Sequence, residues 1–203
     1  MLNPAARTTP TTGTSARAAR RWLEESQRLD IAVYAAIAVT PTPAMDGGLR
    51  RLSRAADHSK LWVGCSAVLA AVGGLRGRRA AENGLASIAL TSAVVNLVLK
   101  PLGNRRRPDR AAADVPLVRH VAMPRSTSWP SGHSASAFAF ATGVGAAWPA
   151  AGVPLSALAS FVAYSRVHTG VHYPSDAIAG AVSGVALAPV AVAAVGRLRQ
   201  KCN

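Results

Sequence analysis

The sequence is poor in three kinds of residue, and each shortage narrows the class of protein. Only two cysteines are present, Cys65 in an apolar run and Cys202 near the C-terminal end, which does not favour a disulfide framework. Aromatic residues make up 5% of the chain, which argues against a nucleic-acid-binding protein that stacks bases on its side chains. Nine acidic residues face 23 Lys and Arg, and the net charge of +14 indicates an anionic partner or surface.

Charge is almost missing from five stretches: residues 61–75, 85–99, 133–148, 153–165 and 177–195. They lack the polar stripe of a solvent-facing helix, and they are rich in the small residues that let helices pack closely in lipid. Most are shorter than the roughly 20 residues needed to cross a bilayer, so flanking residues must extend them. We predict an all-α integral membrane bundle of about five spanning helices; a soluble alanine-rich helical domain is the alternative.

The first 60 residues have a different character. Residues 1–21 contain neither an apolar signal-peptide run nor an acidic residue, and we predict a disordered basic arm there. Residues 22–39 mix apolar with charged side chains, which is typical of an amphipathic helix on a membrane surface. A turn at Gly47 and Gly48 and a short basic helix over 49–58 are expected next. The predicted divisions are therefore the arm 1–21, interfacial helices over 22–60 and a membrane domain over 61–203.

Reactive residue types gather in two of the connections between the apolar runs. Residues 100–130 and 166–175 hold nearly all of them, whereas the connections 76–84 and 149–152 hold few. If all five runs span, the two reactive connections lie on the same membrane face. Lys and Arg cost about 2.5 to 3.5 kcal/mol each at a bilayer centre, so this cluster belongs at the headgroup boundary, where lipid phosphates lie.

The second reactive connection has the denser chemistry. Pro174 suits the first position of a helix, so a helix should open there and place Asp176 in its first turn, within reach of His172. A carboxylate on one imidazole nitrogen leaves the other nitrogen basic, as in a general base or nucleophile. The planar guanidinium of Arg166 suits phosphate. The pattern predicts phosphoryl transfer.

Three segments together resemble the signature of the type 2 phosphatidic acid phosphatase family, which includes lipid phosphatases and the vanadium haloperoxidases. The segments are Lys100 followed after six residues by Arg107-Pro108, then Pro130-Ser131-Gly132-His133, then Ser165-Arg166 followed by His172 and Asp176. Each segment alone is weak, but their joint order and spacing are specific. The resemblance covers residues 85–180.

The resemblance implies a membrane phosphatase that uses no cofactor and no metal. It implies that His172 is the nucleophile that forms a phosphohistidine, that Asp176 orients it, and that His133 protonates the leaving oxygen. The phosphate-binding residues that it implies are Lys100, Arg107, Ser131, Gly132 and Arg166. A vanadate-dependent peroxidase and a non-catalytic lipid-binding or transport protein are the alternative functions.

Other polar residues near these segments have plainer interpretations. His168 is expected to pack or to line the pocket, and His58 and His120 to be structural or surface groups. Arg105, Arg106 and Arg110 either solvate the interface or hold a second anionic part of the substrate. Residues 57–60 are expected to start the first spanning helix, and a role in substrate binding is the alternative.

The expected partners are the bilayer and a lipid phosphate, and nucleic acid is not expected. The Ala- and Arg-rich composition resembles actinobacterial members of the family, some of which remove the 5-phosphate of decaprenylphosphoryl phosphoribose in cell-wall metabolism. Undecaprenyl diphosphate, phosphatidic acid and phosphatidylglycerophosphate are the other expected substrates. Most Lys and Arg residues lie on the reactive side, so the positive-inside rule favours a cytoplasmic catalytic face of the cell membrane. The oligomeric state is left open.

Overall fold

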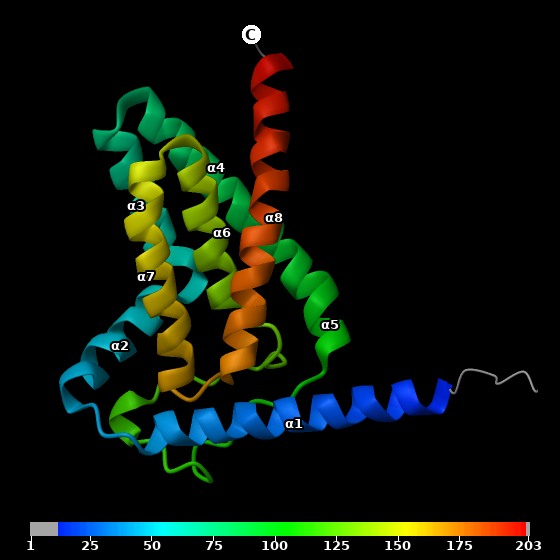
Figure 1. Cartoon of the computed structure of the whole chain (residues 1–203). Coiled ribbons are helices and arrows are strands. Elements are labelled where there is room, and N and C mark those ends of the chain that lie inside the picture. The colour runs from blue at the N-terminus through cyan, green and yellow to red at the C-terminus, as the bar shows by residue number, and fades with distance from the viewer. Residues whose placement is uncertain (1–11, 202–203) are drawn as a thin grey trace, which may run out of the picture.

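The computed structural model describes residues 12–201, and over this range every regular element is helical (Figure 1). The elements are α1 (Thr12–Val39), α2 (Pro43–Ala55), η1 (Asp57–Ser59), α3 (Lys60–Val72), α4 (Gly74–Val94), η2 (Val95–Leu99), α5 (Lys100–Gly103), η3 (Leu117–Arg119), α6 (Gly132–Ala147), α7 (Pro149–His168) and α8 (Pro174–Lys201). Here η1 and η3 are 3₁₀ turns and η2 is a π turn that continues α4 into α5.

Helix α6 lies at the centre of the bundle and packs against α4, α7 and α8. Small residues allow this packing: a side chain at Gly180 or Gly184 of α8 would collide with the α6 backbone. On another side, the buried rings of Trp62 in α3 and Phe140 in α6 lie 5.2 Å apart between centroids. The core therefore rests mainly on close backbone approach and few large side chains.

Three helices in the described range are long and apolar enough to cross a membrane: Gly74–Gly103, Pro149–His168 and Pro174–Lys201. This confirms an all-α membrane bundle. Helices α3 and α6 have 13 and 16 residues and do not meet that length. A count of five spanning helices remains a prediction.

Two connections differ from the sequence-based expectation. Residues 76–84 are helical, because the corner comes earlier, at Gly74, where a φ of +54° suits glycine. The arginines that suggested a link lie exposed on the first turns of α4. Pro149 similarly starts α7 at once, and Gly152 lies inside that helix, against Gly145 of α6.

The N-terminal prediction also needs correction. Helix α1 begins at Thr12, so residues 12–21 are helical where a disordered arm was expected; Ala and Arg are good helix formers. The rest of that arm, residues 1–11, lies outside the described residues. Gly47 and Gly48 lie inside α2, which Pro43 starts, and do not form a turn.

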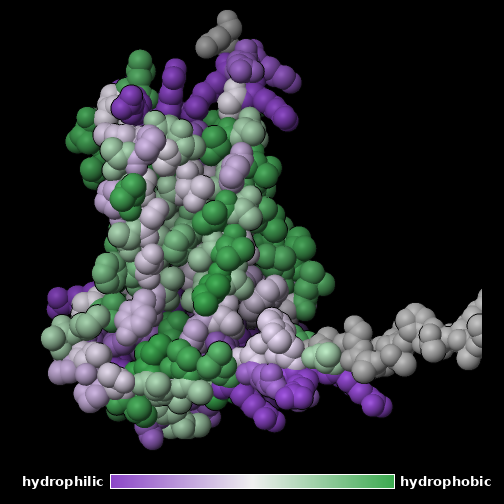
Figure 2. Space-filling model, viewed as in Figure 1, coloured by the Kyte–Doolittle hydropathy of each residue, from purple (hydrophilic) through white to green (hydrophobic). Residues whose placement is uncertain are grey.

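The polar elements collect at two ends of the molecule. At one end, Arg199 of α8 donates hydrogen bonds to Glu82 and Asn83 of α4, at 2.6 and 3.2 Å. At the other end, α1 crosses below the bundle (Figure 1). Figure 2 shows hydrophilic side chains at both ends and mainly apolar ones between them. The exposed apolar surface between the ends is what a membrane-spanning bundle requires.

Candidate active site

The three signature segments meet at the end of the bundle that α1 crosses. The N–H of Ser131, before α6, donates to the carbonyl of Asp176 in α8 at 2.9 Å, which joins two segments through the backbone. The third segment joins through Arg107, whose Nη1 donates to the Val171 carbonyl at 2.7 Å and lies 3.2 Å from Nε2 of His172. The predicted convergence of the two reactive connections is confirmed.

His172 and Asp176 form a buried pair, as the spacing predicts. Nδ1 of His172 lies 3.6 Å from Oδ2 of Asp176, which is fully buried in the first turn of α8. Ser128 bridges them: its hydroxyl donates to the same carboxylate oxygen at 2.5 Å and lies 3.4 Å from Nδ1. With Arg107 on Nε2, this arrangement assigns the proton to Nδ1 and the lone pair to Nε2.

Burial is the main influence on His172. It lowers the pKa of the imidazole to about 4 because the enclosed site disfavours the charged ring. The neighbouring carboxylate of Asp176 opposes this shift, whereas the cations Arg107 and Arg166 add to it. The ring is therefore neutral at physiological pH, the state in which its lone pair is available.

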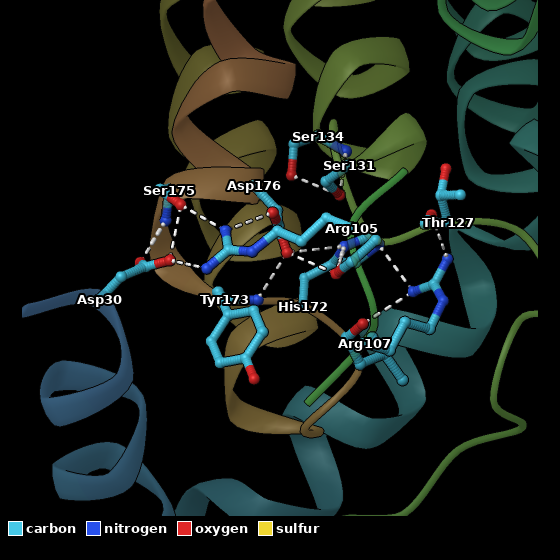
Figure 3. A network of polar contacts seen from close by, with 12 residues as sticks. Asp30, Arg105, Arg107, Thr127, Ser131, Ser134, His172, Tyr173, Ser175 and Asp176 are labelled. Carbon is cyan, nitrogen blue, oxygen red and sulfur yellow. Dashed lines mark hydrogen bonds and ion pairs between the residues drawn. The ribbon is translucent and has the colours of Figure 1, made fainter. Parts of the chain in front are cut away.

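Arg105 does not solvate the interface, which was one of the two expectations for it. Its guanidinium donates to Oδ1 of Asp176 at 2.8 Å and to Oδ2 of Asp30 at 2.6 Å, and it lies 4.2 Å above the Tyr173 ring (Figure 3). Asp30 also accepts the N–H of Ser175 at 2.8 Å. Helix α1 is therefore tied to the carboxylate that orients His172.

Lys100 and Arg107 lie together around Ser126. The Lys100 ammonium donates to the Ser126 hydroxyl at 3.0 Å, and Arg107 donates to the Ser126 carbonyl at 2.9 Å. Arg107 Nη2 also donates to the Thr127 carbonyl at 3.2 Å. These bonds fix two adjacent cations of the site, because both contact the same short stretch of chain.

The start of α6 supplies backbone donors. Ser131 is buried, and its hydroxyl accepts from the N–H and the hydroxyl of Ser134, so it caps the helix. A Cβ added at Gly132 would meet only the Lys100 ammonium, at 3.7 Å. The helix start and Lys100 therefore face the same space, an arrangement that favours an anion.

His133 and Arg166 meet at a residue that the signature does not contain. Nε2 of His133 lies 2.8 Å from Oδ1 of Asp57, and Nη1 of Arg166 lies 3.7 Å from the same oxygen. Arg166 is 1% exposed and donates to the Ser53 hydroxyl at 2.6 Å, while its Nε has no partner among the described residues. An unpaired buried guanidinium N–H is suited to an anionic ligand.

The remaining predicted residues lie outside this cluster. His168 is buried and contacts Thr42 and Asp46, at 2.9 and 3.1 Å, so it packs as expected. Arg110 donates to the carbonyls of Gly170 and Val121 and holds the connection that contains His172. These contacts support the fold around the site.

Comparison with known proteins decides the family. Residues 83–200 match the model of the PAP2 superfamily. The chain belongs to this superfamily. A PAP2 relative from Mycobacterium tuberculosis, named decaprenylphosphoryl-5-phosphoribose phosphatase, is 32% identical over 185 residues, which cover 89% of this chain and 98% of the relative.

Two solved structures share the PAP2 fold with this chain. Aquifex aeolicus LpxE has a TM-score of 0.66 at 24% identity and covers 81% of this chain and 94% of its own. The transmembrane PAP2-type phosphatidylglycerolphosphate phosphatase of Bacillus subtilis has a TM-score of 0.63 at 23% identity, with coverages of 85% and 87%. A likeness at this identity supports the helical architecture.

Five residues that contact the predicted site were not among its predicted members: Asp30, Ser53, Asp57, Ser126 and Ser128. Asp30 and Asp57 are among nine acidic residues in the chain, and that scarcity was the available signal. The serines gave none, because serine is common and their partners are distant in sequence. Ser128, for example, lies 48 residues from Asp176.

Proposed function

We propose that this PAP2 protein hydrolyses a phosphate monoester of a membrane lipid through a phosphohistidine at His172. One observation supports this above all: the buried His172 has its Nδ1 toward Asp176 and its Nε2 toward Arg107, among cations drawn from three separate segments. A site that only holds an anion needs the cations. It does not need a neutral imidazole oriented by a carboxylate.

The first step is in-line displacement at phosphorus. When phosphate oxygens accept the donors of Arg107, Arg166 and Lys100, the lone pair of His172 Nε2 is free to attack. A P–N bond forms and the bond from phosphorus to the leaving oxygen breaks, with its electron pair staying on oxygen. His133 donates a proton to that oxygen. Fixed cations and the start of α6 stabilise the charge that develops on the transferring group.

The second step hydrolyses the phosphohistidine. His133, now unprotonated, accepts a proton from a water that attacks phosphorus, and the P–N bond breaks with its electron pair returning to Nε2 of His172. The bridge from Asp176 to Nδ1 keeps the ring in one tautomer through both steps. The products are inorganic phosphate and the lipid alcohol.

For the substrate, we propose the phosphate of a prenyl-linked sugar. The support is the relative from Mycobacterium tuberculosis, whose name specifies decaprenylphosphoryl-5-phosphoribose and which aligns over 98% of its length. Undecaprenyl diphosphate and phosphatidylglycerophosphate are the competing substrates, and the second is the substrate in the name of the Bacillus subtilis structure. The phosphate site alone does not separate them, because all present a terminal phosphate.

We further propose that the catalytic end faces the cytoplasm. Six of the 23 Lys and Arg residues lie at the opposite end, on the first turns of α4 and the last turn of α8, namely Arg76, Arg78, Arg79, Arg197, Arg199 and Lys201. The positive-inside rule then favours the catalytic end as the cytoplasmic one.

Phosphate release from a panel of lipid phosphates in detergent, with EDTA present, tests the proposed activity. The panel holds a prenylphosphoryl 5-phosphoribose, undecaprenyl diphosphate and phosphatidylglycerophosphate. His172→Ala should abolish release, whereas His120→Ala, whose ring contacts the Val115 carbonyl outside the site, should retain it. Release that persists in His172→Ala would exclude the nucleophile, and release that needs added divalent metal would exclude this mechanism.

A further inference from the structure

A cleft of about 180 Å³ lies beside His133 and has no role in the steps above. Three of its lining residues belong to the proposed site: Lys100, Gly132 and His133. The others are Ala56, His58, Ser59, Ser92, Asn96 and Ser136. The cleft therefore continues from the phosphate position into a space between η1, α4 with η2, and α6.

The position of the cleft matches the leaving-group side of the reaction. In-line displacement places the leaving oxygen on the side of phosphorus opposite to the nucleophile. The proposed acid His133 lines the cleft, as do two groups that would contact phosphate, whereas His172 is not among the described residues that line it. An alcohol that receives its proton from His133 would leave into this space.

One wall of the cleft is polar inside a membrane-spanning helix. Asn96 lies in the π turn η2, within the span Gly74–Gly103. Its Nδ2 donates to the Ser92 carbonyl at 2.8 Å, and no described residue donates to its Oδ1. The Ser92 hydroxyl lies 3.3 Å from that of Ser136 on α6. Polar groups are costly in lipid, and π turns often occur at functional sites, so this wall favours a polar occupant or water.

The facing wall has an unusual backbone. His58 and Ser59 have φ values of +54° and +59°, in the left-handed region that residues other than glycine seldom adopt. These two residues line the cleft, and the residue before them, Asp57, contacts His133 at 2.8 Å. Strain of this kind persists where the surrounding structure holds it in place, and it is common at functional sites.

We infer that this cleft is the leaving-group subsite and that it takes a hydroxylated leaving group about the size of one sugar ring. The inference rests on the proposed function and specifies its substrate class. The volume equals about six waters at roughly 30 Å³ each, which suits one small ring and not a long chain. Ring hydroxyls can donate to Asn96 Oδ1 and exchange hydrogen bonds with Ser59, Ser92 and Ser136. A diacylglycerol leaving group has no further hydroxyl that could form hydrogen bonds with these groups.

The test compares two lipid phosphates whose leaving groups are both primary alcohols. One is farnesylphosphoryl 5-phosphoribose, whose leaving oxygen is on a pentose with free ring hydroxyls, and the other is dioctanoyl phosphatidate, whose diacylglycerol leaving group has no further free hydroxyl. Initial rates of phosphate release in detergent give kcat/KM for wild type, Asn96→Leu and Ser136→Ala. The matched control is Ser183→Ala, whose hydroxyl donates to the Ala179 carbonyl at 2.7 Å within the α8 span, away from the cleft.

We expect Asn96→Leu to lower kcat/KM for the pentose lipid by about tenfold, and Ser136→Ala by a few fold, because the sugar hydroxyls lose partners. Activity on phosphatidate should change less than twofold in both, which also shows that the variants fold. An equal loss on both lipids, or no loss on the pentose lipid, would overturn the subsite. Wild-type enzyme that releases phosphate from neither lipid would instead overturn the proposed function, and the subsite with it.

Discussion

At the scale of single residues, burial determines what His172 can do. The ring is 1% exposed, and the absence of solvent around it lowers its pKa to about 4. A free imidazole, with a pKa near 6.5, is partly protonated at neutral pH and is then a poor nucleophile. In this site the lone pair on Nε2 is available over the whole physiological pH range. The proposed phosphate-binding cations Arg107 and Arg166 add to this effect of burial and help to keep the proposed nucleophile unprotonated.

The lowered pKa of His172 predicts where kcat/KM falls on the acid side of its pH profile. Protonation of His172 blocks Nε2, so kcat/KM should fall only as the pH drops through about 4, not through 6.5. Arg107→Met removes a positive charge that lowers this pKa, so the limb should move to higher pH. Initial rates between pH 3.5 and 8 locate the acid limb. Recovery of activity after return to pH 7 is the control. A limb at pH 6.5 in wild type would contradict the assignment.

Asp57 is the second residue whose contact suggests a specific effect. Its carboxylate lies 2.8 Å from Nε2 of His133 and opposes the lowering of the pKa of that ring by burial, so it favours the protonated form that the acid role requires. We expect Asp57→Asn to lower kcat for a lipid phosphate by about 100-fold, the lower end of the usual range for general acid catalysis. The aryl ester p-nitrophenyl phosphate leaves without a proton, so its hydrolysis should fall less than threefold.

The control for Asp57 is Asp109→Asn. Asp109 accepts the N–H groups of Ala111 and Ala112 in an exposed turn and contacts no proposed catalytic group. It should leave the rates on both substrates within twofold of wild type. If Asp57→Asn instead lowered both rates by the same factor, its role would be structural and not to position the acid.

At the scale of elements, α1 contributes a residue to the candidate site. Asp30 reaches the site through Arg105, whose guanidinium is shared with the buried carboxylate of Asp176. Because a charge in a nearly dry site is costly without a partner, loss of Asp30 leaves Arg105 to pull on Asp176 alone. The position of the surface helix therefore affects the orientation of the nucleophile.

Asp30→Asn should lower kcat about tenfold, which corresponds to about 1.4 kcal/mol of transition-state stabilisation, with KM within twofold. KM should hold because the phosphate-binding cations are untouched. Glu25→Gln on the same helix removes an exposed pair with Arg21 and should leave both constants unchanged. Steady-state kinetics in detergent separates the two constants. An increase in KM alone would indicate damage to substrate binding instead.

The elements also show what the sequence could predict. The helix start at Pro174 followed from local chemistry, and the pairing of His172 with Asp176 followed from their spacing of one helical turn. The arginines before Gly84 led to a wrong prediction of a connection there. Charged residues at a helix end on a membrane face give the same sequence pattern as a connection between two helices. Asp30 and Asp57 lie 75 and 76 residues from Arg105 and His133, and no local pattern indicates contacts at that distance.

At the scale of the whole molecule, function depends on the separation of two polar ends by an apolar surface. The end that α1 crosses contains the proposed phosphate site, and the cleft beside it opens among helices that include the span Gly74–Gly103. If Arg107 and Lys100 bind phosphate as proposed, a lipid can keep its tail in the bilayer while its phosphate contacts them at the boundary. At the opposite end, Arg199 pairs with Glu82 and contributes nothing to this site.

The proposed orientation makes a prediction for intact cells. Single cysteines at Ala112, exposed at the catalytic end, and at Gln200, exposed near the end of α8, report the two faces when Cys65 and Cys202 are replaced by serine. With the catalytic end in the cytoplasm, a membrane-impermeant maleimide should label Gln200→Cys in intact cells and Ala112→Cys only after permeabilisation. The reverse pattern would place the catalytic end outside. Equal labelling of both before permeabilisation would contradict a bundle in which α8 crosses the bilayer, because its two ends must then lie on opposite faces.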